Sequence, residues 1–277
     1  MQEARVAIIG AGHIGSALVR GFLETGRCKR EHLMATIPSE EKAQQLREEL
    51  GIQVESDNRK ACGWARVIVF CVKPQVMASV LQEVADTVSE DKLVTSVVAG
   101  IPTQFIEGCL GKQVGVVRLM PNIAVLSRQG ATGMCRGRFV RDEDVEYVRN
   151  LFSSVGMVME VSEDLMDAVT GLSGTGPMYI FQVIEGLSDA GVKVGLSREK
   201  AYALAVQTVL GAALMARDLG EHPGQLKDLV TSPAGTAISA LHLMERSGFR
   251  AILMDAVEEA ARRSAELGKL HTLGSSD

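Results

Sequence analysis

Three glycines near the start of the chain are spaced as in a phosphate-binding turn. Gly10, Gly12 and Gly15 form the pattern GxGxxG directly after the short apolar run of residues 6–9. In such a turn the first glycine permits the tight bend, the second leaves the backbone open to a pyrophosphate, and the third lets the next helix pack closely on the strand. Free N–H groups at that helix start also attract a diphosphate. The spacing predicts a bound dinucleotide; the alternative is a glycine-rich turn without a ligand.

The next predicted strand, residues 32–36, ends without the acidic residue that would select NAD. In an NAD-selective unit an Asp or Glu at this point holds the ribose 2′-hydroxyl. Here the strand ends at Thr36 and the first acid is Glu40. A 2′-phosphate would meet no repelling carboxylate and could accept hydrogen bonds from Thr36, Ser39 and Lys42. We therefore expect NADPH, with NADH as the alternative; the other interpretation is a solvent-exposed loop.

Three further apolar runs end in polar or glycine turns. They are residues 67–72, followed by Lys73-Pro74; residues 93–98, followed by Ala99-Gly100; and residues 114–119, followed by Met120-Pro121-Asn122. Open α/β sheets bind their ligands at the carboxyl ends of the strands. We therefore expect these turns to share one edge of a sheet with the glycine turn. At that edge Lys73 either touches the cofactor or is solvated.

A second group of small polar residues lies nearer the end of the chain. Residues 230–237 read VTSPAGTA, and a predicted helix follows. Hydroxyl residues and glycine at a helix start leave exposed N–H groups that suit a carboxylate.

The elements that must hold these turns follow from the apolar pattern. Strands alternate with helices as far as residue 161, and the central strands are apolar on both faces, which is typical of a doubly wound parallel sheet. The expected strands are residues 6–9, 32–36, 53–54, 67–72, 93–98, 114–119 and 157–161; the expected helices run from the glycine turn to residue 24 and over 40–50, 76–84, 103–110 and 142–152.

From about residue 163 the pattern predicts helices only. They cover residues 164–171, 178–192, 198–219, 237–246 and 249–267, with a break at 172–177, a short helix from 222 and a frayed end from 268. A chain of 277 residues can hold two domains, each with its own core. We therefore expect an α/β protein with a Rossmann-type, NAD(P)-binding domain at residues 1–162 and an all-α domain at residues 163–277.

One predicted helix of the second half is apolar almost all round. Between Ala201 and Ala216 only Gln207 and Thr208 are polar, and such a helix must be buried on every side. A domain of about a hundred residues has little interior to surround it. We therefore expect a second copy of the chain to cover it in an obligate homodimer with interwoven helices; the alternative is a helix at the centre of its own bundle.

Composition argues against several functional classes. The net charge of -5 and the lack of a long basic run argue against a nucleic-acid-binding surface. No apolar run reaches the ~18 residues of a membrane span, and the first residues lack the features of a signal peptide. The five cysteines, without CxxC spacing or nearby histidines, predict neither disulfides nor a metal site. We expect a cytoplasmic protein that binds no metal, nucleic acid or membrane.

Several motifs, taken together and in order, resemble the signature of pyrroline-5-carboxylate reductases. The most specific are DAVTGLSGTGP at residues 167–177, GVKVGL at 191–196 and HPGQLKD at 222–228. The glycine turn, CVKP at 71–74 and SP at 232–233 stand in the matching order around them. The resemblance therefore covers nearly the whole chain.

The resemblance implies a reaction, an assembly and a set of site residues. The reaction is hydride transfer from NAD(P)H to the imine carbon of 1-pyrroline-5-carboxylate, giving L-proline. The assembly is a homodimer through the helical domain, with further association into a pentamer of dimers. Cofactor contacts are implied for Gly10, Gly12, His13, Ile14, Gly15, Thr36, Ile37, Asn58, Val72, Lys73, Pro74, Ala99, Met120 and Asn122, the last two beside the nicotinamide. Substrate contacts are implied for Val230, Ser232, Pro233, Gly235 and Thr236, with Thr236 as the catalytic candidate.

The substrate turn departs from the family pattern at two positions. The family commonly carries a hydroxyl near the substrate nitrogen where this chain has Ala237, and a glycine where it has Ala234. Either Thr236 or a water replaces the hydroxyl, or no side-chain donor is needed. Because an iminium carbon is already electrophilic, placing the nicotinamide and fixing the carboxylate could suffice, and we expect no indispensable general base. His222 is interpreted as a helix cap rather than an acid.

Two other functions stay open. The same architecture serves reductases of hydroxy acids and keto acids, which usually need a Lys or His base, and in the helical half only Lys193 and Lys227 stand out for that role. The third interpretation is a sensor that binds NADPH without turnover.

Overall fold

The computed structural model describes residues 4–273 and divides into two compact units. Unit 1 comprises the residues up to 175 together with those from 258 onward, and unit 2 comprises residues 176–257. The boundary expected from the sequence, at residue 163, lies earlier. It differs because the segment just after residue 163 packs on a strand of unit 1 and because the last helix contributes residues to both units.

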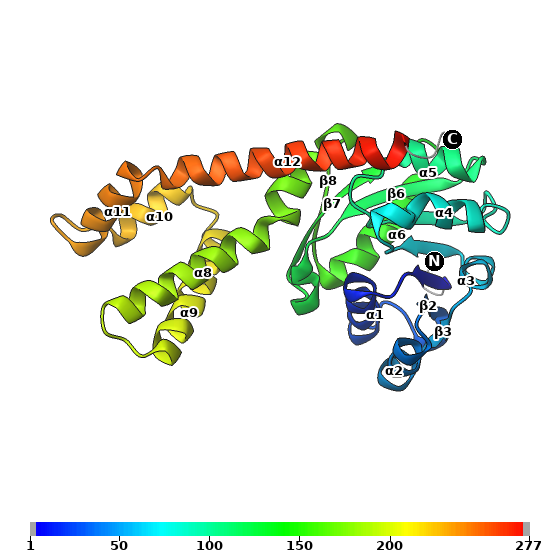
Figure 1. The fold of residues 1–277 in the computed structure, drawn as a ribbon, viewed down its shortest axis with the longest axis horizontal. Coiled ribbons are helices and arrows are strands. Elements are labelled where there is room, and N and C mark those ends of the chain that lie inside the picture. Colours follow the sequence, from blue (N-terminus) through cyan, green and yellow to red (C-terminus); the bar gives the residue numbers. More distant parts are fainter. Residues whose placement is uncertain (1–3, 274–277) are drawn as a thin grey trace. The chain divides into compact units, whose positions relative to one another are not determined.

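Unit 1 is built on one sheet with the strand order β3-β2-β1-β4-β5-β6-β7-β8. Strands β1 to β6 run parallel, β7 is antiparallel to β6, and β8 is parallel to β7. The strands, coloured from blue to green in Figure 1, are β1 (Val6–Ile9), β2 (Leu33–Thr36), β3 (Gln53–Glu55), β4 (Val67–Phe70), β5 (Leu93–Ser96), β6 (Gly115–Met120), β7 (Gly130–Arg136) and β8 (Gly156–Glu160). The predicted doubly wound sheet is confirmed, with an antiparallel strand added.

An apolar core lies on each face of this sheet. Alternate residues of β1 enter different cores: Ile8 packs in the one with Phe22, and Ile9 in the one with Phe70. A strand buried on both faces must be apolar throughout, which is the pattern seen at residues 6–9. The helices of the sheet region are α1 (His13–Glu24), α2 (Glu40–Leu50), α3 (Asn58–Trp64), α4 (Pro74–Val84), α5 (Thr103–Leu110) and α6 (Asp142–Phe152).

Helix α3 and strand β7 lie outside the sequence expectations. The short helix α3 forms because the Asp57 carboxylate caps it, accepting hydrogen bonds from the N–H groups of Arg59 (2.8 Å) and Lys60 (3.1 Å). Strand β7 contains two glycines, which weaken the strand pattern. A Cβ at Gly133 would lie 2.6 Å from the Val169 side chain, so close packing against a helix requires this glycine.

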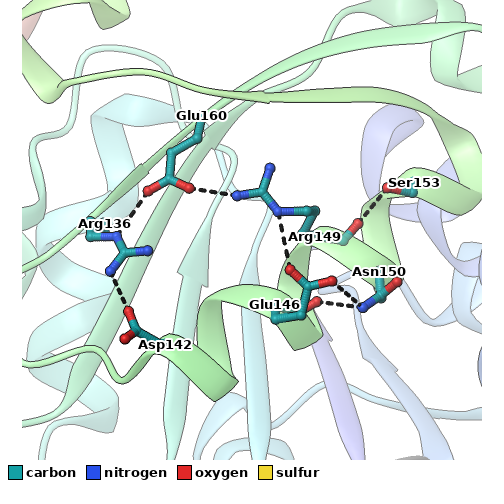
Figure 2. A network of polar contacts seen from close by, with 7 residues as sticks. All are labelled: Arg136, Asp142, Glu146, Arg149, Asn150, Ser153 and Glu160. Carbon is teal, nitrogen blue, oxygen red and sulfur yellow. Dashed lines mark hydrogen bonds and ion pairs between the residues drawn. The ribbon is translucent and has the colours of Figure 1, made fainter.

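A network of charged side chains ties the edge strand β8 to its neighbours. Arg136 on β7 donates to Glu160 on β8 at 2.9 Å and to Asp142 on α6 at 2.7 Å. Arg149 on α6 donates to the other oxygen of the Glu160 carboxylate at 2.5 Å (Figure 2). Exposed ion pairs are individually weak, but a shared carboxylate links three elements at once. The network thus holds strand β8 and helix α6 together.

The break expected at residues 172–177 is a continuous helical passage. Helix α7 (Met166–Val169) leads into a π-helical turn over Thr170–Gly174, and α8 (Gly176–Lys193) starts directly after it. The N–H of Thr175 donates to the carbonyl of Thr170, five residues earlier, at 2.9 Å. We name residues 170–174 the π-turn. The glycines and small residues there indicate a wider helical turn rather than the end of a helix.

Unit 2 consists of α8, α9 (Arg198–Leu219), α10 (Pro223–Val230), α11 (Thr236–Arg246) and the first part of α12 (Phe249–Leu273). The expectation of a frayed end is wrong for residues 268–273, which are helical, and residues 274–277 lie outside the described part of the chain. Gly268 does not end the helix. It lets the backbone pass close to Gly100, since a Cβ there would lie 2.8 Å from the Gly100 carbonyl oxygen.

Helix α9 is largely uncovered in the single chain. Only Ala201 and Ala205 of this helix are buried, whereas Leu204 is 57% exposed and Leu210 is 49% exposed. The interpretation that its own bundle surrounds this helix is therefore wrong. An exposed apolar face of this extent is typical of a protein–protein interface. Across residues 4–273, no helix has the length and apolar character that crossing a membrane requires.

Candidate dinucleotide site

The glycine turn after β1 is fixed by strand β2. The N–H of Gly10 donates to the backbone carbonyl of Thr36 at 3.2 Å and to its hydroxyl at 3.1 Å, and the N–H of Ala11 donates to the same carbonyl at 2.8 Å. Gly10 has a φ of 93°, which favours glycine. The turn therefore depends on Thr36 as well as on its own glycines.

The space around the three glycines separates their roles. A Cβ at Gly15 would lie 2.6 Å from the Gly10 carbonyl oxygen, and a Cβ at Gly10 would lie 2.9 Å from the side chain of Val72. A Cβ at Gly12 would meet nothing within 4 Å. Gly10 and Gly15 thus serve packing of the protein on itself, whereas Gly12 leaves open space. This is the arrangement a pyrophosphate requires.

The start of α1 provides the electrostatic part of an anion site. Gly12 is the N-cap, it offers no side-chain cap, and the first turn contains no acidic residue. The N–H groups of a helix start and its dipole then face outward with no carboxylate to compete. His13 is exposed and Ile14 half-buried beside this opening. The residues present fit a dinucleotide diphosphate.

The sheet brings most of the predicted cofactor residues to one edge. Ile9 pairs with Thr36 on one side and with Phe70 on the other, and Phe70 pairs with Ser96, so β1, β2, β4 and β5 end level. The residues just beyond these ends are Ile37, Val72, Lys73, Pro74 and Ala99. Lys73 is exposed and precedes α4, and Val72 packs against Gly10. Their contact with a cofactor stays a prediction.

The expectation that Thr36 donates to a 2′-phosphate does not hold in this structure. Thr36 is 2% exposed, and its hydroxyl donates to Oδ1 of Asn58 at 2.8 Å. A threonine hydroxyl has one proton, so none is left for a phosphate. Asn58, also predicted at the cofactor, is half-buried and donates to Glu83 at 3.1 Å. Thr36 thus bonds the glycine turn directly, and Asn58 bonds Thr36.

Asn122 and Met120, predicted beside the nicotinamide, both contact the π-turn. Asn122 is 8% exposed; its Nδ2 donates to the Ser173 carbonyl at 3.0 Å, and its Oδ1 accepts from the N–H groups of Ala124 (3.2 Å) and Ala131 (3.3 Å). Met120 packs on Gly174, where a Cβ would lie 2.8 Å from the Met120 methyl carbon. The amide of Asn122 is thus occupied by backbone partners.

Unit 1 contains a pocket beside these loops, and most of its lining residues were not predicted from the sequence. A pocket of about 290 Å³ is lined by the predicted residues Pro74 and Ala99 and by residues that were not predicted: Gln75, Gly100, Thr170, Thr175, Ala260, Arg263, Ser264 and Leu267. Ser264 on α12 donates to the Asp167 carboxylate at 2.6 Å and so joins α12 to α7 beside this pocket. Part of the signal was present in residues 172–177, which we interpreted as a helix break.

An ion pair joins half-buried Glu163 to buried Arg118. Glu163 accepts from the N–H of Thr103 at 2.7 Å and from Arg118 at 3.3 Å, and Arg118 is 5% exposed. The carboxylate thereby caps the start of α5 and neutralises a buried guanidinium. It fixes the segment before α7 to the sheet.

The predicted substrate residues lie in unit 2, around the start of α11. Ser232, Pro233, Ala234 and Gly235 form a tight turn closed by the N–H of Gly235 donating to the Ser232 carbonyl at 3.0 Å. Ala234 has a φ of 56°, a conformation that favours glycine, and a Cβ at Gly235 would lie 2.3 Å from the Ser232 hydroxyl. We name residues 232–235 the hydroxyl turn.

The hydroxyl turn leads into a helix start that is open to an anion. Gly235 is the N-cap of α11 without a side-chain cap, and the first turn has no acid. Val230 is the last residue of α10, Ser232 and Pro233 lie in the hydroxyl turn, and Thr236 is the first residue of α11. Such a start suits a carboxylate. His222 caps α10, because its Nδ1 accepts from Gly224 N–H at 3.1 Å while its backbone N–H donates to Gln225, so its interpretation as a cap is confirmed.

Burial raises the pKa of the cysteine thiols. It raises the pKa of Cys28 to about 11 and those of Cys62 and Cys135 to about 12, with burial as the leading cause in each case. Burial also raises the pKa of Cys71, which lies beside Gly15. All five cysteines are free. Within residues 4–273, no three His, Cys, Asp or Glu side chains are grouped so that they could hold a metal ion.

Comparison with known proteins identifies the family. Residues 163–267 match the model of the pyrroline-5-carboxylate reductase dimerisation domain, and residues 5–100 match that of NADP oxidoreductases, coenzyme F420-dependent. The chain is 44% identical over 269 residues to the pyrroline-5-carboxylate reductase of Methanosarcina acetivorans, covering 97% of this chain and 100% of the relative. It is 41% identical over 268 residues to that of Arabidopsis thaliana, covering 97% of each.

Solved structures agree along the whole chain. A pyrroline-5-carboxylate reductase of Coxiella burnetii superposes with a TM-score of 0.90 at 35% identity, covering 95% of this chain and 98% of the other. The Plasmodium falciparum pyrroline carboxylate reductase, solved with NADP bound, gives a TM-score of 0.88 at 33% identity, covering 97% of this chain and 99% of the other. The glycine turn, the open helix starts and the length of these matches lead to one conclusion: the chain belongs to the pyrroline-5-carboxylate reductase family.

Proposed function

We propose that this protein reduces 1-pyrroline-5-carboxylate to L-proline with NADPH as the hydride donor. The observation that carries the proposal is the open space at Gly12 beside an uncapped helix start without acidic residues, in a chain 44% identical to a pyrroline-5-carboxylate reductase over 97% of its length. The relative from Plasmodium falciparum was solved with NADP, which supports the choice of cofactor.

We assign different roles to the two domains expected from the sequence. In the proposal residues 1–162 bind the dinucleotide: Gly12, His13 and Ile14 at its diphosphate, with the loops at Ile37, Val72 to Pro74, Ala99 and Met120 around the rest of it. Bound there, the nicotinamide supplies a hydride to the imine carbon. Asn58, Thr36 and Asn122 hold these loops in place through the hydrogen bonds described above.

Residues 163–277 hold the substrate and the partner chain. The N–H groups at the start of α11 receive the substrate carboxylate, and Ser232, Thr236, Val230 and the hydroxyl turn surround the ring. Orientation and charge complementarity supply the catalysis, because the protonated imine is already electrophilic. Ala237 offers no hydroxyl, so Thr236 is the side chain closest in sequence that can donate to the ring nitrogen.

We also propose a homodimer that assembles further into a pentamer of dimers, located in the cytoplasm. The dimerisation model covers residues 163–267, and α9 leaves Leu204 and Leu210 uncovered in one chain. Five free cysteines are typical of a reducing compartment.

The test is NADPH oxidation followed at 340 nm with the purified protein. We expect turnover with 1-pyrroline-5-carboxylate and none with 2-keto acids. Turnover of keto acids alone would assign the protein to the related reductases, and binding of NADPH without turnover of either would make it a sensor. The variant Ser232→Ala should raise the KM for the imine more than the Kd for NADPH, whereas equal changes would contradict the placement of the substrate at the hydroxyl turn.

A further inference from the structure

A chain of three hydrogen bonds runs from helix α4 to the glycine turn. Glu83 accepts from Nδ2 of Asn58 at 3.1 Å, Oδ1 of Asn58 accepts from the Thr36 hydroxyl at 2.8 Å, and the Thr36 oxygen accepts from the N–H of Gly10 at 3.1 Å. The residues come from α4, α3, β2 and the β1–α1 turn, all in unit 1.

The donor-to-acceptor direction of these three hydrogen bonds is set by Glu83. A carboxylate can only accept hydrogen bonds, so Glu83 obliges the Asn58 amide to turn its NH2 group outward and its oxygen toward Thr36. The Thr36 proton then points at Asn58, which leaves a lone pair of the Thr36 oxygen for Gly10. The opposite amide orientation would leave the proton of a hydroxyl that is 2% exposed without that acceptor.

We propose that Glu83 is a positioning residue for the dinucleotide turn: through Asn58 and Thr36 it fixes the backbone of Gly10. This inference rests on the proposed function, since it explains how the cofactor turn is held before NADPH binds. Glu83 itself is exposed, and its backbone carbonyl accepts from Arg59 at 3.1 Å, which anchors this part of α4 to α3.

The first test reverses the hydrogen bond. In Asn58→Asp two carboxylates face each other and neither can donate. The new carboxylate can still accept from Thr36, but repulsion from Glu83 displaces it. In the double variant Asn58→Asp with Glu83→Gln, the glutamine amide donates to the new carboxylate, which can again lie against Thr36, and the net charge equals that of the unaltered protein. We expect the Kd for NADPH, measured by fluorescence titration, to rise about tenfold in the single variant and to return to within about threefold in the double variant.

The second test leaves Asn58 intact and keeps the measurement usable if the first variant folds poorly. Glu83→Gln retains an acceptor and should bind NADPH as the unaltered protein does. Glu83→Ala lets the Asn58 amide turn over, and we expect a Kd about threefold higher with kcat at saturating substrates within about twofold. In the cofactor-free protein, hydrogen exchange at Gly10 should speed up in Glu83→Ala and stay slow in Glu83→Gln.

The outcomes separate this inference from the proposed function. A double variant as weak as Asn58→Asp, or equal effects of Ala and Gln at position 83, would show that Glu83 does not set the turn, even with normal NADPH binding by the unaltered protein. Failure of the unaltered protein to bind NADPH would instead refute the proposed function.

Discussion

The side-chain amide of Asn122 donates to the backbone carbonyl of Ser173 across 3.0 Å and so joins the end of β6 to the π-turn. The same amide accepts from two backbone N–H groups, those of Ala124 and Ala131, on either side of the loop that leads to β7. Because Met120 packs on Gly174, the end of β6 and the π-turn are held by a polar and an apolar contact. An amide side chain supplies both the donor and the acceptor needed here.

Replacing Asn122 with aspartate should therefore weaken the protein more than an exposed amide replacement does. The introduced carboxylate would keep an acceptor for Ala124 but would place a negative charge against the Ser173 carbonyl. We expect the free energy of unfolding, measured by urea unfolding, to fall by about 2 kcal/mol or more. The matched control is Asn150→Asp on α6, where the amide is exposed and donates to Glu146, and where a change within about 0.5 kcal/mol is expected. Equal losses of unfolding free energy in the two variants would contradict the role of Asn122 in joining β6 to the π-turn.

The glycines of the turn should separate binding from stability. Gly12→Ala adds a methyl into open space at a backbone φ of -75°, so the free energy of unfolding should change by less than about 1 kcal/mol. The Kd for NADPH should rise at least about tenfold, because the methyl occupies the approach of the pyrophosphate. Gly15→Ala drives a methyl to 2.6 Å from the Gly10 carbonyl oxygen and should cost about 1–3 kcal/mol of stability. A stable Gly15→Ala protein or unchanged binding in Gly12→Ala would refute this assignment.

The parts of the fold and site that could be predicted are those that depend on local pattern. The strand before Gly10, the turn and helix α2 follow from apolar runs and glycine spacing, and α2 spans the same residues, 40–50, in the structure. The hydroxyl of Thr36 could not be assigned in this way, because its proton is taken by Asn58 from a helix twenty-two positions later. Sequence shows which groups can donate, whereas only the fold shows which are already bonded.

Two further differences involve glycines, because a glycine either ends a helix or allows two backbone segments to approach closely. Gly268 was taken as the end of the last helix, yet it passes against the Gly100 carbonyl within a helix that continues to Leu273. Residues 172–177 were predicted to break the helix, yet Gly174 belongs to the π-turn, which also carries Thr170 to the pocket. Neither contact is encoded in the neighbouring residues.

Stability should fall in alkaline solution because of the buried thiols. The pKa of Cys28 is raised from 9.0 to about 11 and that of Cys62 to about 12, mainly by burial. Between pH 9 and the folded pKa the unfolded chain loses a proton that the folded chain keeps, so the free energy of unfolding decreases as pH rises. Each thiol contributes up to about 1.4 kcal/mol per pH unit in that window.

The variant Cys28→Ala provides the check on this effect. Urea unfolding at about pH 7.5, 9 and 10 should show a shallower decrease in the variant than in the unaltered protein, whatever the packing loss at the lowest pH. Identical slopes would mean that the Cys28 thiol does not contribute to the alkaline loss of stability.

The apolar face of α9 should determine the oligomeric state. Leu210 is 49% exposed in the single chain, within a helix whose Leu204 and Tyr202 are each more than half exposed. In a dimer through this helix, Leu210→Glu would bury a charge without a partner, which costs several kcal/mol at each interface. Light scattering after gel filtration should show a monomer, and turnover should be lost if the partner chain completes the helical domain. The control Gln45→Glu adds the same charge on the exposed face of α2 and should leave the dimer intact. A dimeric Leu210→Glu protein would place the interface on another surface of the chain.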